Sequence, residues 1–103
     1  MLIIHALLKN SWESCTDYYG ENYITSEGFI HCSDVHTFYK VAPNFADVQE
    51  DMLLLFIETD LVESPIKWED LDGYGTEYPH IYGLLNVNAV VRIVPFLREE
   101  WGI

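Results

Sequence analysis

The chain has 103 residues, which is the size of one domain, spanning 1–103, with a single hydrophobic core. Half of the residues are hydrophobic and 15% are aromatic, so the composition is that of a folded protein rather than a disordered one. Seventeen acidic residues against five basic ones give a net charge of −12. This charge disfavours nucleic acid and anionic membranes as partners, because both attract clustered Lys and Arg.

The start of the chain predicts a buried strand followed by a helix. Residues 1–8 are almost wholly apolar except for His5, a pattern typical of a central strand. Asn10 is placed to cap a helix, because Glu13 follows three residues later as in a capping box. We expect that helix to end near Gly20.

The following segments predict two short strands and a second helix. Residues 23–25 and 28–32 have the composition of strands. Ser33 is placed to cap a helix over residues 35–42, where apolar side chains recur at helical spacing. Pro43 is expected to end or kink that helix.

The second half of the chain reads mainly as strands. Residues 52–57 form the most apolar run, and 66–69 follow as a short strand. Residues 70–77 contain two glycines and predict a loop, after which 78–83 and 89–95 again read as strands. The total of about five or six strands and two helices, without regular alternation, favours an α+β fold over a doubly wound sheet.

His31 marks the first candidate site. Alternation along a strand puts Phe29, His31 and Ser33 on one face, and Glu27 lies four residues before the histidine. An imidazole can act as an acid, a base or a hydrogen-bond donor. The alternative is a buried histidine bonded to backbone, with Ser33 serving only as a helix cap.

His80 marks the second candidate site, because Tyr78 and Tyr82 share its strand face. Two tyrosines offer stacking surfaces and hydroxyl donors to a planar ligand, although an ordinary aromatic cluster has the same pattern. His5 alone is more typical of a satisfied core histidine. It becomes part of a site only if it meets His31 or His80 in space.

Glu69 is a candidate catalytic carboxylate, since it follows an aromatic residue directly before the glycine-containing loop; the alternative is a solvated carboxylate.

Neither Cys-x-x-Cys nor His-Glu-x-x-His occurs, so we expect no metal site. Cys32 would face away from its neighbouring histidine, which argues against a nucleophile. We expect Cys15 and Cys32 to be free thiols of a cytoplasmic protein, since the first residues lack a basic leader and their apolar run is too short for a signal peptide.

Together these segments resemble a bacterial family, domain of unknown function 952, over essentially the whole chain. The resemblance rests on His5 followed by Trp12, on the block Glu27-Gly28-Phe29-Ile30-His31-Cys32-Ser33, on the apolar run at 52–57, on Trp68-Glu69, and on Tyr78-Pro79-His80-Ile81-Tyr82-Gly83. It implies a small α+β domain with a split, strongly bent β structure, related in fold to the ADP-ribosyltransferases.

That superfamily cleaves the glycosidic bond of NAD, so the resemblance implies NAD as cofactor, whereas the residues themselves imply none. By position, His5 resembles the first-strand residue of those enzymes, Tyr78 or Tyr82 would stack on nicotinamide, and Glu69 would steady an oxocarbenium-like transition state. The catalytic residues we expect are His5, His31 and Glu69. The ligand-binding residues we expect are Trp12, Ser26, Glu27, Ser33, Tyr78, His80 and Tyr82.

Two functions follow from these observations. The first is a domain with an ADP-ribosyltransferase-like cleft that binds, or transfers from, NAD or a related nucleotide. The second is a non-catalytic ligand-binding or interaction domain whose histidines form a structural hydrogen-bond network. The family's RNA phosphotransferase relatives use several arginines on phosphate, whereas this chain has only Arg92 and Arg98. The first function requires the side chains of His5, His31 and His80 to share one cleft.

Overall fold

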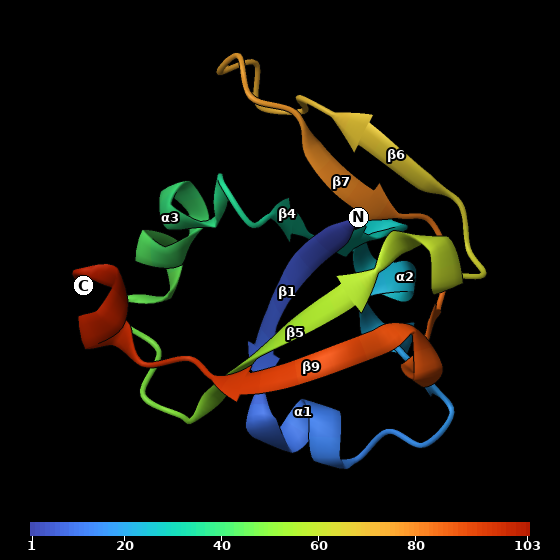
Figure 1. The fold of residues 1–103 in the computed structure, drawn as a ribbon, viewed down its shortest axis with the longest axis horizontal. Coiled ribbons are helices and arrows are strands. Elements are labelled where there is room, and N and C mark those ends of the chain that lie inside the picture. Colours follow the sequence, from blue (N-terminus) through green and yellow to red (C-terminus); the bar gives the residue numbers. More distant parts are fainter.

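Two apolar strands form the centre of the main sheet. The computed structural model describes all residues, 1–103 (Figure 1). In it, β1 (Leu2–Leu8) and β5 (Met52–Glu58) pair antiparallel along their whole lengths. β4 (Ser33–Asp34) borders β1 and β9 (Val90–Pro95) borders β5, so the strand order is β4-β1-β5-β9.

A second sheet lies above the end of the first. Its order is β3 (Ile30–His31), β7 (Tyr78–Ile81) and β6 (Ile66–Glu69), all antiparallel. In Figure 1, β6 and β7 form a ribbon that extends beyond the main sheet toward the top of the view. β2 (Tyr18–Tyr19) and β8 (Leu85–Asn86) make a separate two-stranded ladder.

The helices are short. They are α1 (Lys9–Glu13), α2 (Glu21–Glu27) and α3 (Phe38–Val41). Single 3₁₀ turns occur at Ala42–Phe45, Thr59–Leu61, Val87–Ala89 and Arg98–Trp101. The last of these turns lies next to α3 in Figure 1, on the left of the view.

Both faces of the main sheet are covered, which explains why its central strands are apolar without alternation. Ile3 and Leu7 of β1 belong to one core cluster, which also contains Ile81 of the second sheet. Ile4 points to the opposite face and belongs to a second cluster with Phe38 of α3. The prediction of a central strand at the start of the chain is therefore confirmed.

The α+β class is confirmed, but the predicted element count is wrong. The structure has nine strands and three α-helices rather than five or six strands and two helices. Four of the nine strands have only two residues each. A pair of residues carries no periodicity, and only the partner strand decides that such a pair is extended.

The first predicted helix is much shorter than expected. It begins at Lys9, directly after the strand, and Asn10 lies inside it instead of capping it, since no side chain caps its start. It ends at Glu13 rather than near Gly20, because Tyr18 and Tyr19 are extended and form the strand β2, which pairs with β8. Tertiary pairing overrides the local capping signal here.

The strand predicted at residues 23–25 is wrong, because this segment lies in α2. Gly20 and Gly28 bound the helix with left-handed φ values of 108° and 86°. Gly28 also explains why the following strand covers only Ile30–His31 instead of residues 28–32. In the helical form, Tyr23 packs against the core cluster.

Ser33 does not cap the second predicted helix. It is buried in β4, and Asp34 makes the turn instead: its Oδ1 accepts hydrogen bonds from the backbone amides of His36 and Thr37, both at 2.8 Å. The helix itself is α3, one turn long, and it passes into a 3₁₀ turn that contains Pro43. The prediction that Pro43 ends the α-helix is confirmed.

Candidate functional site

A cleft of about 720 Å³ opens beside the edge of β1, between α3 and the loop that joins β6 to β7. β4 pairs with β1 only at Ile3 and Ile4, which leaves the edge of β1 open at His5 and Ala6. His5 and Ala6 therefore line the cleft. The second sheet supplies His31, His80, Glu69 and Tyr78 to the same cleft.

His80 and Glu69 form a hydrogen-bonded pair on neighbouring strands. In the β6–β7 register, Lys67 lies opposite His80 and Glu69 lies opposite Tyr78, so these side chains share one face. Nδ1 of His80 donates to Oε1 of Glu69 at 3.0 Å, and the hydroxyl of Tyr82 donates to the same oxygen at 2.5 Å. The prediction that His80 and its flanking tyrosines share a face is confirmed.

These hydrogen bonds keep Glu69 charged. The Tyr82 hydroxyl and, next, the His80 ring stabilise the carboxylate, so the pKa of Glu69 is lowered from its ordinary value. The same carboxylate raises the pKa of Tyr82, because it accepts a hydrogen bond from the neutral phenol and repels a phenolate. The site thus holds a fixed negative charge at the side of a nearly buried imidazole.

Phe29 packs among the rings of this group. Its ring centroid lies 4.4 Å from that of His80, 4.8 Å from that of His31 and 5.1 Å from that of Tyr82. Contacts of this kind hold the imidazole planes in place as well as burying apolar surface. Phe29 therefore restrains the orientation of both histidines.

His31 lies directly opposite His80 in the β3–β7 pair, with the two ring centroids 5.4 Å apart. Nε2 of His31 lies 3.0 Å from Oε1 of Glu27, the last residue of α2 and four residues earlier in the chain. Both of these side chains are about half exposed (50% and 45%), so water competes for the pair. His31 is thus held more loosely than His80.

His5 is fully engaged within the protein. Its Nδ1 donates to the backbone carbonyl of His31 at 2.6 Å, and its Nε2 accepts from the Tyr19 hydroxyl at 2.8 Å, since a carbonyl can only accept. Burial lowers the pKa of His5 from 6.5 to about 4. His5 is therefore neutral near pH 7, and it joins β1 to β2 and β3.

The loop at the mouth of the cleft is shaped by Asp70. Its carboxylate accepts the backbone amides of Gly73, Tyr74 and Gly75 at 2.9, 3.1 and 2.7 Å. Nζ of Lys40 on α3 donates to the Thr76 hydroxyl of this loop at 3.1 Å and so joins the two sides of the mouth. The predicted loop at residues 70–77 is confirmed.

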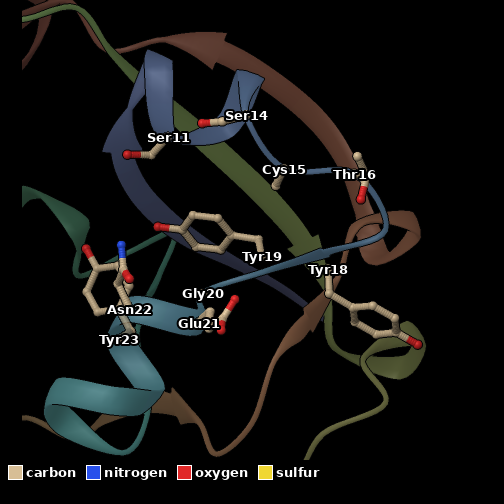
Figure 2. A pocket seen from close by; sticks show the side chains of 10 residues that line it. All are labelled: Ser11, Ser14, Cys15, Thr16, Tyr18, Tyr19, Gly20, Glu21, Asn22 and Tyr23. Atoms are coloured by element: carbon tan, nitrogen blue, oxygen red, sulfur yellow. The ribbon is translucent and has the colours of Figure 1, made fainter.

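A second pocket of about 400 Å³ lies between α1 and α2. Figure 2 shows the Tyr19 side chain crossing it between Cys15 and Tyr23, while the Tyr18 ring points away. Tyr23 lines both this pocket and the large cleft. Tyr19 lines the second pocket and His5 lines the large cleft, so the hydrogen bond from the Tyr19 hydroxyl to His5 lies in the wall between the two cavities.

The structure brings most of the predicted site residues together. The large cleft is lined by His5, His31, Ser33, Glu69, Tyr78 and His80. Glu27 and Tyr82 do not line it but bind its residues through hydrogen bonds. Trp12 and Ser26 lie elsewhere: Trp12 packs near Tyr19, with ring centroids 6.4 Å apart, and the Ser26 hydroxyl donates to the Asn22 carbonyl on α2.

Sequence reasoning gave no role to Phe29, Tyr19, Tyr23 or Lys40, which the structure places in or beside the cleft. Phe29 could have been found, because strand alternation already puts it on the face of His31. Tyr23 was obscured by the wrong strand prediction for its segment. Nothing in the sequence signals that Tyr19 meets His5, since the two belong to different sheets.

Both cysteines are free, and burial raises the pKa of each thiol. No group of three or more His, Cys, Asp or Glu side chains is arranged to hold a metal ion. None of the helices combines the length and the apolar character that a membrane crossing requires.

The fold and the cleft define a small α+β domain in which two sheets and a short helix surround a histidine- and carboxylate-lined cavity. The chain belongs to the family described as Protein of unknown function (DUF952), whose model matches residues 6–93. The resemblance inferred from the sequence is thereby confirmed at the level of the family.

Solved structures of the protein CC0527 from Caulobacter crescentus are similar to this chain. The crystal structure of CC0527 and that of a double mutant each share 26% identity with it, cover 100% of both chains and have a TM-score of 0.79. The solution NMR structure has 28% identity and a TM-score of 0.72, and covers 90% of this chain and 82% of that one. No curated protein matches this chain.

Proposed function

We propose that the large cleft binds a small, flat ligand of the nucleotide class and that the domain cleaves it. The observation that supports this most is the convergence of His31, His80, Glu69 and Tyr78 on one cavity. A cavity of about 720 Å³ is in the range of small-molecule and cofactor sites. Polar groups that converge in such a cavity are a common feature of active sites.

NAD is the ligand that we propose to test first, because the sequence resembles a family related in fold to the ADP-ribosyltransferases. In this proposal Tyr78 stacks on the nicotinamide ring. Glu69, kept ionised by its neighbours, stabilises the positive charge that develops on the ribose as the glycosidic bond breaks. Backbone amides and Lys40 would contact the phosphates, since no arginine lines the cleft.

The environment of His5 favours a structural role for that residue and supports the second function in part. Both of its ring nitrogens are bonded to protein groups, so neither is free to bind a ligand or move a proton. We therefore assign chemistry to the second sheet and treat His5 as the residue that ties β1 to it. If the same held for His31 and His80, the domain would be a non-catalytic binding module.

Incubation with NAD labelled in the nicotinamide ring tests the proposal. We expect release of labelled nicotinamide and a rise in the melting temperature with NAD. Glu69→Gln should lower the release about 100-fold or more, the usual effect of removing one transition-state-stabilising group. Glu50→Gln is the matched control, because Glu50 is exposed and lies outside the cleft.

Each outcome separates the candidate functions. A melting shift without nicotinamide release would favour the non-catalytic binding module. Absence of both the shift and the release would overturn NAD as the ligand. An equal loss in Glu69→Gln and Glu50→Gln would contradict the role of Glu69.

A further inference from the structure

Only one of the two ring nitrogens of His80 forms a hydrogen bond to the protein. Nδ1 carries the proton, because its partner is a carboxylate oxygen that can only accept. In the neutral ring, Nε2 therefore carries a lone pair. Nε2 has no hydrogen-bond partner in the protein. If it were fully buried, it would be a buried atom without a partner, but the only such side-chain atom is Oγ1 of Thr37. Nε2 therefore meets the cleft, although only 5% of the side chain is exposed.

The surrounding residues fix the position of this nitrogen. Oε1 of Glu69 accepts a hydrogen bond from Nδ1 of His80, and the Tyr82 hydroxyl donates to the same carboxylate oxygen. Nζ of Lys67 lies 4.7 Å from the centroid of the Tyr82 ring, and Phe29 packs against the imidazole. A carboxylate that orients a histidine and stabilises its protonated form is the usual support of a general base.

The other cleft histidines lack this combination. His5 is buried and both of its nitrogens are occupied. His31 is half exposed, and its carboxylate partner Glu27 is also exposed, so water competes for the hydrogen bond that would orient its ring. His80 is thus the histidine with a supported Nδ1, a free Nε2 and a place on the cleft wall.

We propose that His80, oriented by Glu69, is the general base of the cleft and acts on a water molecule or hydroxyl group. This role rests on the proposed function, since the cleft must hold a ligand that the activated oxygen attacks. With NAD, the oxygen forms a bond to C1′ of the ribose while its proton goes to Nε2 of His80. The C1′–N bond breaks, nicotinamide leaves as a neutral ring with the bonding pair, and His80 later gives its proton to solvent.

The variant that tests this role is His80→Asn. The amide nitrogen of asparagine can replace Nδ1 and keep the hydrogen bond to Glu69, whereas the Nε2 position is lost. We expect kcat to fall at least about 100-fold with ligand binding changed less than threefold, and the acid limb of the pH–rate profile to disappear. His36→Asn is the control, because His36 is exposed and lies outside the cleft.

Nitrogen NMR of the wild-type protein provides a readout that does not depend on turnover. We expect the neutral His80 ring to be protonated at Nδ1 and unprotonated at Nε2, with Glu69→Ala removing this preference. A proton on Nε2 in the neutral ring would overturn the proposal, as would His80→Asn with more than a tenth of the wild-type kcat. If NAD is not cleaved, the proposed function fails for NAD, while the NMR result still decides whether His80 is poised as a base.

Discussion

The histidines of this small domain differ in how many of their ring nitrogens form hydrogen bonds to protein groups. His5 and His80 are both buried. Both ring nitrogens of His5 form hydrogen bonds, to Tyr19 and to the backbone of His31, whereas only one ring nitrogen of His80 does, to Glu69. Burial with full hydrogen bonding makes a structural residue, because no polar atom is left for a ligand. Burial with one free nitrogen in a cleft makes a candidate for chemistry.

The buried His5 makes stability depend on pH. Its pKa is about 4 in the folded protein, against 6.5 for a solvated histidine side chain, so between these values the unfolded chain binds more protons. The stabilisation is fully present above pH 6.5 and is lost as the pH falls toward 4. The shift corresponds to about 3 kcal/mol of unfolding free energy.

Urea unfolding between pH 7 and pH 4 measures this effect. We expect the fall in unfolding free energy to be about 3 kcal/mol larger in the wild type than in His5→Gln, which has no proton to gain at this position. His36→Gln, at an exposed position, should behave as the wild type. Equal pH slopes in the wild type and His5→Gln would show that His5 is already protonated, or solvated, in the folded state.

At the scale of elements, long strands were predictable and short ones were not. Strand alternation correctly put Phe29 with His31, and Tyr78 with His80 and Tyr82, because period two is visible within a few residues. The helix α2 escaped detection because its β-branched residues suggest a strand. The signal that was available is the pair of glycines at its ends, at positions that need a left-handed backbone.

Gly20 offers a test of how α2 is fixed. A Cβ at Gly20 would meet the side chain of Ile30, whereas one at Gly28 would meet nothing, although both residues have positive φ. We expect Gly28→Ala to cost about 1 kcal/mol from backbone strain alone. Gly20→Ala should cost at least about 2 kcal/mol more, because overpacking is added. Thermal or urea unfolding measures both, and equal losses would mean that Ile30 moves aside freely.

At the scale of the whole molecule, the charge of −12 acts on stability. The molecule measures 33 × 33 × 26 Å, and the Debye length is about 30 Å at 0.01 M salt and about 8 Å at 0.15 M. At low salt each carboxylate therefore repels almost all the others. At 0.15 M only near neighbours interact.

We expect the free energy of unfolding to rise on the order of 1 kcal/mol from about 0.01 M to about 0.15 M NaCl, because surface potentials of several kT are screened. The double variant Glu13→Gln with Glu50→Gln, at two exposed positions, should show a smaller rise. The measurement is urea unfolding at constant pH. A fall in stability with salt would mean that attractive ion pairs outweigh the net repulsion.

The sequence by itself determined the α+β class, the long strands, the acidic net charge and the two histidine-bearing blocks, because each follows from composition or from periodicity within one segment. Only the tertiary structure decided which histidines are free. The environment of an imidazole depends on groups distant in the chain, as Tyr19 is for His5 and Glu69 is for His80. Glu69 reaches His80 because β6 pairs with β7, and no local pattern tells which strands pair. Tyr19 reaches His5 from β2, a strand of two residues that carries no local signal.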